Sequence, residues 1–265
     1  MAQHPAFEAA RWHAAIAGRR SRRVFDGTPV GPHAAETLRE TADAFRPYQD
    51  ARVVYLTDPP ADLFIGIAGS YGRVTGAPAA LVFIQDGRSS NAEEHCGYTG
   101  EGVVLEAHAI GLDTCWIAGT FSPAKARTLV TLEPGEVVRG VSPVGHATAT
   151  APFSERLIFG AGAPKKRRPL DEIAPGHETW PEWAREGVRA ARLAPSAVNR
   201  QPWRFRYENG SVTVSAHGID APRYRPRLDC GIAMLHFELG ARAAGGDGAW
   251  VPLSAPDVAR WEPLD

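Results

Sequence analysis

The sequence lacks most of the features that mark secreted, membrane-spanning or nucleic-acid-binding proteins. Its 265 residues include three cysteines and no CxxC pair, which argues against a disulfide framework and fits structural thiols in a reducing compartment. No apolar run approaches the ~18 residues that a membrane span needs, and the N-terminus has no continuous apolar stretch typical of a secretion signal. A net charge of −1 disfavours nucleic acid, because phosphate backbones require a positive excess. We expect a cytoplasmic protein without membrane or nucleic-acid partners.

Several common site motifs are missing as well. There is no P-loop, no GxGxxG that opens a βαβ unit, and no GxSxG around Ser196. A dinucleotide site of the Rossmann type and a hydrolase nucleophile are therefore not indicated. His95 has no second ligand pair at metal spacing nearby, so we expect no zinc site there.

Hydrophobic patterning predicts a chain in which helices and strands are mixed. Apolar periodicity indicates helices at 5–18, 33–45, 99–110, 180–193 and 231–244. It indicates strands at 51–57, 79–85, 112–119, 136–146 and 249–253, and the Asn209-Gly210 pair predicts a hairpin over 204–216. The fold class is therefore α+β. The Gly/Pro-rich stretch 159–170 is the expected boundary between two parts, 1–170 and 171–265.

Two parts of the chain resemble each other. Residues 96–116 align without a gap on residues 230–250, at an offset of 134, and eight of 21 positions are identical. The identities include the Cys-Gly pair that begins each segment and the Trp that ends it. Coincidence between two Ala/Gly-rich helices is the alternative. If the repeat is real, the chain carries two related halves that pack as the subunits of a symmetric dimer would.

Two basic clusters are the first candidates for a binding site. Arg19-Arg20-Ser21-Arg22-Arg23 reads as extended, so Arg19, Ser21 and Arg23 would share one side. Lys165 and Arg167 would pair in the same way within Lys165-Lys166-Arg167-Arg168. Guanidinium groups match phosphate oxygens bidentately. Each cluster alone reads as a solvated basic face; together, in a chain of nearly zero net charge, they favour a phosphate site.

The stretch LAPSAVNRQPWRF, 193–205, follows a helix and leads into a strand. Pro195 stiffens this turn, and Ser196 and Asn199 can each donate and accept hydrogen bonds. Ending the helix with local hydrogen bonds is an equally good explanation of the turn alone. Ile117-Ala118-Gly119 follows a buried strand, where a backbone N–H can face a ligand or simply begin a turn.

Taken together, RRSRRVF, GLDTCWIAG, KKRRPL and LAPSAVNRQPWRF resemble the motifs of the FMN-dependent nitroreductase superfamily. The order differs from that of an ordinary member, in which the APSxxNxQPW turn follows soon after RRSxR. Here the turn comes only after KKRRP. Family members are homodimers whose FMN lies at the interface and contacts both subunits. The chain is therefore similar to a sub-group with internal duplication, a single-chain pseudo-dimer that keeps one composite flavin site and acts as a monomer.

The resemblance implies a role for each matching residue. Those expected near the FMN phosphate and ribityl chain are Arg19, Ser21, Arg23, Lys165 and Arg167. The amides of Ala118 and Gly119 would face the reactive edge of the ring, and Pro195, Ser196 and Asn199 would contribute from the second half. Ser70 and Arg73 fall where the family places contacts to the pyrimidine ring, although the local match is poor. No side chain is implied as a catalytic acid or base.

The implied activity is hydride transfer from NADH or NADPH through FMN to a small acceptor such as a nitroaromatic or a quinone. Three other functions stay open at this stage. The chain could be a flavin-binding protein without turnover, a dehydrogenase or dehalogenase on the same fold, or a relic without cofactor. The intact basic clusters argue against the last of these.

Overall fold

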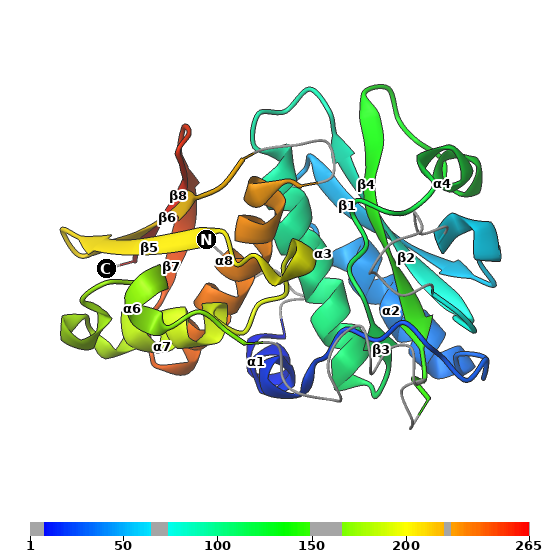
Figure 1. Ribbon diagram of the computed structural model, residues 1–265, viewed down its shortest axis with the longest axis horizontal. Coiled ribbons are helices and arrows are strands. Elements are labelled where there is room, and N and C mark those ends of the chain that lie inside the picture. The colour runs from blue at the N-terminus through cyan, green and yellow to red at the C-terminus, as the bar shows by residue number, and fades with distance from the viewer. Residues whose placement is uncertain (1–7, 65–73, 149–165, 220–223, 265) are drawn as a thin grey trace.

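The computed structural model describes residues 8–64, 74–148, 166–219 and 224–264. It contains two antiparallel four-stranded sheets, with strand orders β1-β2-β4-β3 and β5-β6-β8-β7. The sheets lie toward opposite ends of the molecule, and helices α3 and α8 run between them (Figure 1). This is the mixed α+β class that the sequence predicts. Within these described residues, no helix is both long and apolar enough to cross a membrane.

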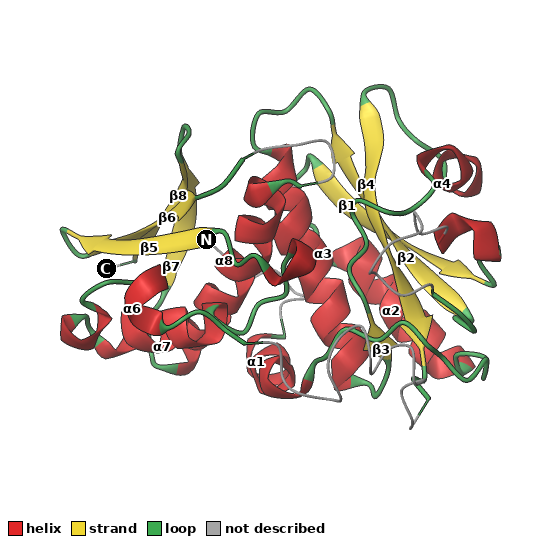
Figure 2. Ribbon diagram, in the orientation of Figure 1, coloured by secondary structure: helices red, strands yellow, loops and turns green. Residues whose placement is uncertain are grey.

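We call residues 8–148 the first half and residues 166–264 the second half. In chain order, the first half contains α1 (Ala9–Gly18), α2 (Pro32–Ala44), β1 (Ala51–Thr57), the 3-10 turn η1 (Ala61–Phe64), β2 (Ala79–Asp86), α3 (Ala92–Ala109), β3 (Asp113–Thr114), α4 (Pro123–Leu129) and β4 (Glu136–Gly145). The second half contains α6 (Leu170–Ile173), η2 (His177–Thr179), α7 (Glu182–Ala191), η3 (Ala197–Asn199), β5 (Trp203–Glu208), β6 (Ser211–Ala216), α8 (Pro226–Ala243), β7 (Gly248–Pro252) and β8 (Asp257–Pro263). Figure 2 shows both sheets with their helices.

The first sheet is covered on both faces. Along β2, Ala79, Leu81 and Phe83 pack in one buried cluster with α2 and α3. The alternate side chains Ala80, Val82 and Ile84 pack in another cluster, which includes residues of η1 and α4. Because successive strand residues point to opposite faces, a strand buried on both faces reads as one continuous apolar run.

Helices α3 and α8 cross at very close range. A Cβ atom added to Gly97 in α3 would lie 2.1 Å from the Leu228 carbonyl oxygen, and one added to Gly231 in α8 would lie 1.9 Å from that of Glu94. Each helix therefore presents a glycine to the backbone of the other, as at the two-fold axis of a dimer. Gly231 follows Gly97 by 134 residues, and Leu228 follows Glu94 by the same 134, which is the offset of the sequence repeat.

The ends of the two helices match in the same register. α3 spans Ala92–Ala109 and α8 spans Pro226–Ala243, with every bound displaced by 134. Gly111 and Gly245 follow their helices with φ of +85° and +81°, the left-handed conformation that glycine adopts most readily at such ends. The two halves thus share the order of their strands and the register of their central helices.

The observed elements differ from the expected ones in a few places. α3 begins at Ala92, well before the predicted start at 99. The strand predicted at 112–119 is reduced to Asp113–Thr114, with a separate bridge from Ile117 to Val141. Strand β8 and helix α4 were not predicted. Most of the proposed boundary at 159–170 lies outside the described residues.

Candidate functional site

The first basic segment lies beside the short edge strand β3. Ser21 forms a parallel bridge with Thr114, and the Arg22 amide donates to the Thr114 carbonyl at 2.8 Å. The Arg23 carbonyl accepts from the Thr75 amide at 3.0 Å. The predicted extended conformation is therefore present. Backbone hydrogen bonds to Thr114 and Thr75 hold this conformation. Because the backbone alone makes these bonds, the side chains of the segment can differ in burial.

Arg19 is the most buried member of this segment, with only 5% of its surface exposed. Its Nε lies 3.8 Å from Glu101 Oε1, beyond hydrogen-bond distance. Among the described residues this Nε has no hydrogen-bond acceptor. A buried guanidinium donor without an acceptor costs free energy unless a ligand supplies one.

Glu101 joins Arg19 to the end of β3. It is fully buried in α3 and accepts a hydrogen bond from Trp116 Nε1 at 2.6 Å. His236 Nε2, on α8, lies 2.8 Å from its other oxygen. Glu101 is one of four glutamates in α3, so its sequence position does not distinguish it from the others. One carboxylate therefore links the basic segment, the β3 end and the second half.

Beyond Trp116 the chain exposes two backbone donors. Within the described residues, neither the Ala118 nor the Gly119 amide has a hydrogen-bond acceptor, whereas Ile117 N–H is paired with Val141. Gly140 on β4 permits this approach, because an added Cβ would lie 3.1 Å from the Ile117 carbonyl oxygen. Half-buried amides without partners are suited to donate to a ligand.

The second basic segment reaches the turn before β5. Arg167 donates through its guanidinium to the carbonyls of Leu193 and Ala194, at 2.8 and 2.6 Å, and to Asn199 Oδ1 at 3.2 Å. In return, Asn199 Nδ2 donates to the Lys166 carbonyl at 3.1 Å. The amide group of Asn199 is thus engaged with the basic segment, which fixes one segment against the other.

Several other arginines lie near Arg167. Burial, and after it repulsion by neighbouring cations, lowers the pKa of Arg167 to about 10. Those cations are Arg19, Arg20 and Arg192. The predicted basic groups of the two segments are therefore brought into electrostatic range, where an anion would relieve their mutual repulsion.

The turn itself has a strained backbone. Val198, Asn199 and Gln201 have φ of +48°, +60° and +51°, values that are unfavourable for residues other than glycine and worst for a β-branched one. Ser196 Oγ accepts from the Gln201 amide at 2.9 Å, so the local hydrogen bonding considered from the sequence is present. Strain of this kind persists only where the surroundings enforce it, and it is concentrated at functional sites.

Asp229, at the start of α8, holds this turn. Its two carboxylate oxygens accept from the Ala197 amide at 3.2 and 3.1 Å. Burial raises the pKa of Asp229 to about 7, although the Ala197 hydrogen bond and nearby arginines oppose the shift. This residue was also missed, since a single Asp in RPRLDC carries no signal of its distant partner.

The structure thus brings together Arg19, Arg167 and the Pro195–Asn199 turn, and places Ser21 and the Ala118–Gly119 amides along the β3 side. Three other expected site residues, Ser70, Arg73 and Lys165, lie outside the described residues. All three cysteines are buried free thiols, as structural thiols should be.

Several solved structures are similar to this chain. One is the crystal structure of "a putative nitroreductase" from Thermotoga maritima, 21% identical, with a TM-score of 0.63 over 94% of this chain and 92% of that one. Another is titled an oxidoreductase containing FMN, 20% identical, with a TM-score of 0.49 over 60% and 88% of the two chains. A Bacteroides fragilis nitroreductase with bound FMN is 18% identical, with a TM-score of 0.43 over 53% and 90%.

No curated protein sequence matches this chain. The family model described as "Putative TM nitroreductase" matches residues 12–241. That match spans most of both halves, including the basic segments, the β3 end and the turn before β5. This chain therefore belongs to the "Putative TM nitroreductase" family.

Proposed function

We propose that this protein is an FMN-dependent oxidoreductase that transfers hydride from NADH or NADPH to a small acceptor, such as a nitroaromatic or a quinone. The observation that carries the proposal is the group of arginines around Arg167, together with the buried Arg19 Nε that has no acceptor among the described residues. A bound anion would offset the repulsion within such a group, and family membership makes the phosphate of FMN the natural candidate.

The residues present fit FMN in three ways. Arg19 and the Ser21 segment offer donors for a terminal phosphate, with Arg167 adding positive charge from the other side. The amides of Ala118 and Gly119 would face the ring, where fixed N–H donors orient it and stabilise negative charge. The turn at Pro195–Asn199 closes the site from the second half. Bound FMN would supply the capacity to accept and deliver hydride.

This chain's own residues provide binding, orientation and electrostatics rather than acid or base chemistry. Arg19 and Arg167 lower the free energy of a bound dianion. The hydrogen bonds of Asn199 and Asp229 keep the turn in its strained conformation before any ligand arrives, so less ordering has to occur on binding. Donor and acceptor would use one open face in turn, which predicts ping-pong kinetics.

The first test is an absorption spectrum of protein loaded with FMN, followed by anaerobic addition of NADH or NADPH. We expect bleaching of the flavin band and its recovery when a quinone is added. A loaded protein that neither nucleotide bleaches would instead be a flavin-binding protein without reductase turnover.

The second test addresses the phosphate assignment. A charge-assisted hydrogen bond contributes roughly 1.5–3 kcal/mol, so Arg19→Ala should weaken FMN binding by about one to two powers of ten. Arg22→Ala is the matched control, because Arg22 belongs to the same segment but is exposed. FAD should bind less well than FMN, since the arginines would surround a terminal phosphate. Equal FMN affinity of the Arg19→Ala and Arg22→Ala variants would show that the assignment is wrong.

We also propose that the halves are a fused pair that needs no partner chain. The reciprocal Gly97 and Gly231 contacts support this assembly, with the first part ending near residue 170. The expected flavin-loaded species has the mass of one chain, 28.5 kDa, by sedimentation or light scattering. Loss of FMN whenever a larger species dissociates would contradict it.

A further inference from the structure

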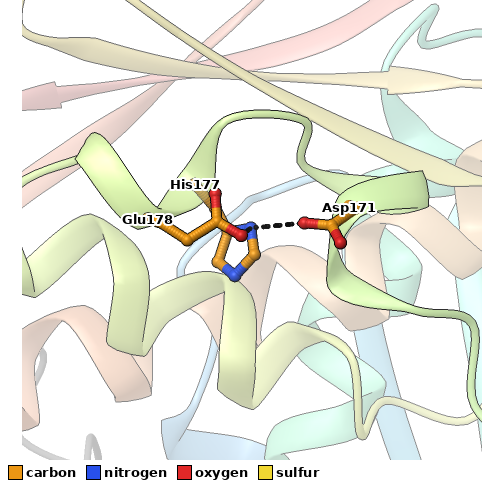
Figure 3. A group of neighbouring side chains, drawn as sticks. All are labelled: Asp171, His177 and Glu178. Carbon is orange, nitrogen blue, oxygen red and sulfur yellow. Dashed lines mark ion pairs between the residues drawn. The ribbon is translucent and has the colours of Figure 1, made fainter.

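Three side chains meet where α6 is followed by η2, outside the site described above. Asp171 lies on α6, while His177 and Glu178 begin η2. Figure 3 shows the imidazole of His177 with both carboxylates turned toward the same ring nitrogen. One ligand atom from each residue lies within 4.8 Å of the other two.

His177 is the buried member of this group. Its side chain is 9% exposed, whereas those of Asp171 and Glu178 are 75% and 64% exposed. Its Nδ1 is buried and makes no hydrogen bond to any described residue. A buried ring nitrogen without a partner, aimed at two carboxylates that face solvent, indicates a missing ligand between them.

The distances suit a cation better than an ion pair. Nδ1 lies 3.4 Å from Asp171 Oδ1 and 3.5 Å from Glu178 Oε1, too far for charge-assisted hydrogen bonds, which are about 2.7–2.9 Å long. Ligand atoms about 2.1 Å from a tetrahedral metal are roughly 3.4 Å apart. The two observed distances are therefore close to the edges of one coordination tetrahedron.

The charge of the group points the same way. Asp171 and Glu178 bring two acidic side chains to the group, and no lysine or arginine of the described ranges forms an ion pair with either of them. The neighbouring Glu172, by contrast, pairs with Arg168 and Arg204. Arginines of the protein therefore neutralise Glu172, whereas Asp171 and Glu178 remain available to a cation from solution.

We propose that Asp171, His177 and Glu178 form a binding site for one transition-metal dication of the zinc type. An imidazole nitrogen with two carboxylate oxygens favours Zn²⁺ and similar ions over Mg²⁺, which prefers an all-oxygen octahedron. Three protein ligands leave one tetrahedral position for water. The metal joins α6 to η2 and is independent of flavin binding.

The test uses the full chain after EDTA treatment, with and without FMN, and titrates ZnCl₂ against a chromophoric chelator. We expect one zinc per chain. Asp171→Asn and Glu178→Gln should each weaken binding at least tenfold, because each change removes a charged ligand yet alters an exposed side chain that leaves the fold intact. Glu182→Gln, an exposed acid at the start of α7, is the matched control and should bind zinc as the parent does.

Two further measurements identify the ligands. Cobalt(II) should give the intense visible bands of tetrahedral coordination, and a ¹H–¹⁵N spectrum should show the Nδ1 resonance of His177 shifting on zinc addition. The proposal is overturned if the parent binds no zinc at millimolar concentration, if the Asp171→Asn/Glu178→Gln double variant binds as the parent does, or if Mg²⁺ binds as tightly as Zn²⁺.

Discussion

The segments that lead into the first strand of each sheet differ sharply. Before β1, the ring of Tyr48 stacks on His95 of α3 at 3.8 Å, with 6° between the ring planes. His95 Nδ1 lies 2.8 Å from the Asp50 carboxylate, which also accepts from Ser89 Oγ at 2.5 Å. This end of the first half is filled by its own side chains.

Before β5, the corresponding segment is the strained turn at Pro195–Gln201. Asp229 of α8, which stands 134 residues after His95, accepts from the Ala197 amide. Equivalent positions on the two central helices therefore hold an aromatic stack in one half and a turn with ligand-binding features in the other. The two halves thus place different segments on the same framework, and the candidate site depends on the segment rather than on the framework.

The largest expected effect tests how Asp229 holds the turn. Its pKa is about 7 in the folded protein and near 3.8 in an unfolded chain. The folded state therefore binds a proton that the unfolded state has released, and stability falls as pH rises from about 4 to 7. Asp229→Asn should remove this loss, raising the free energy of unfolding at pH 8 by up to about 4 kcal/mol relative to the parent.

Urea unfolding of parent and variant at pH 4.5 and pH 8 measures this difference. Asp43→Asn, an exposed carboxylate on α2, is the control and should not change the pH dependence. An Asp229→Asn variant with the same pH dependence as the parent would mean that the carboxylate is hydrated.

An intermediate effect is expected at the crossing of α3 and α8. Gly97→Ala and Gly231→Ala would each place a methyl carbon much closer to a carbonyl oxygen than van der Waals contact allows, at 2.1 and 1.9 Å. Overpacking of this kind costs roughly 1–3 kcal/mol or more. Because the contact is reciprocal, the two variants should lose similar stability by urea unfolding. Gly31→Ala, with no atom within 4 Å of the added Cβ, should lose little. A large loss in only one variant would break the symmetry of the comparison.

The smallest effect concerns Asp50. Burial would raise its pKa, but hydrogen bonds from His95 and Ser89 outweigh burial and hold it below the usual value. Folding thus favours the charged form of Asp50. Its contribution to the free energy of unfolding is present above about pH 4 and is lost as pH falls through the folded pKa. Because Asp50 is partly exposed, Asp50→Asn should cost no more than about 1 kcal/mol at pH 7. The difference in unfolding free energy between parent and Asp50→Asn should shrink as pH falls below about 4 toward about 2, opposite in sign to Asp229. A difference that stays constant down to about pH 2 would contradict this origin.

Much of the framework could be predicted from the sequence because its signals are local. The apolar runs of β1 and β2 and the Asn209-Gly210 turn each specify one element. The early start of α3 could not, because Ala92–Val103 is buried on nearly all sides between the halves and so shows no amphipathic stripe. β8 was missed because a register shift opposite Val214 and Ser215 places Val258 and Ala259 side by side in the core, which interrupts strand alternation.

The candidate site was only partly predictable for a similar reason. Arg19, Arg167 and the turn at 195–199 could be singled out as candidates because their residue types and motifs are recognisable in the sequence alone. Glu101 and Asp229 act through partners 15 to 135 residues away, and a single carboxylate reveals no such partner. The unpaired Nδ1 of His177 is likewise a property of packing.

The reciprocal contact of Gly97 and Gly231 has a consequence for how this site can change. In a homodimer every substitution occurs twice, so an aromatic stack at one position would occur in both subunits. Here the residues on either side of the crossing are encoded separately, so the Tyr48–His95 stack can lie before β1 while the strained turn at 195–199 lies before β5. The link between the halves also makes their association intramolecular, so it does not weaken on dilution. Asymmetry and insensitivity to concentration follow from the same covalent connection.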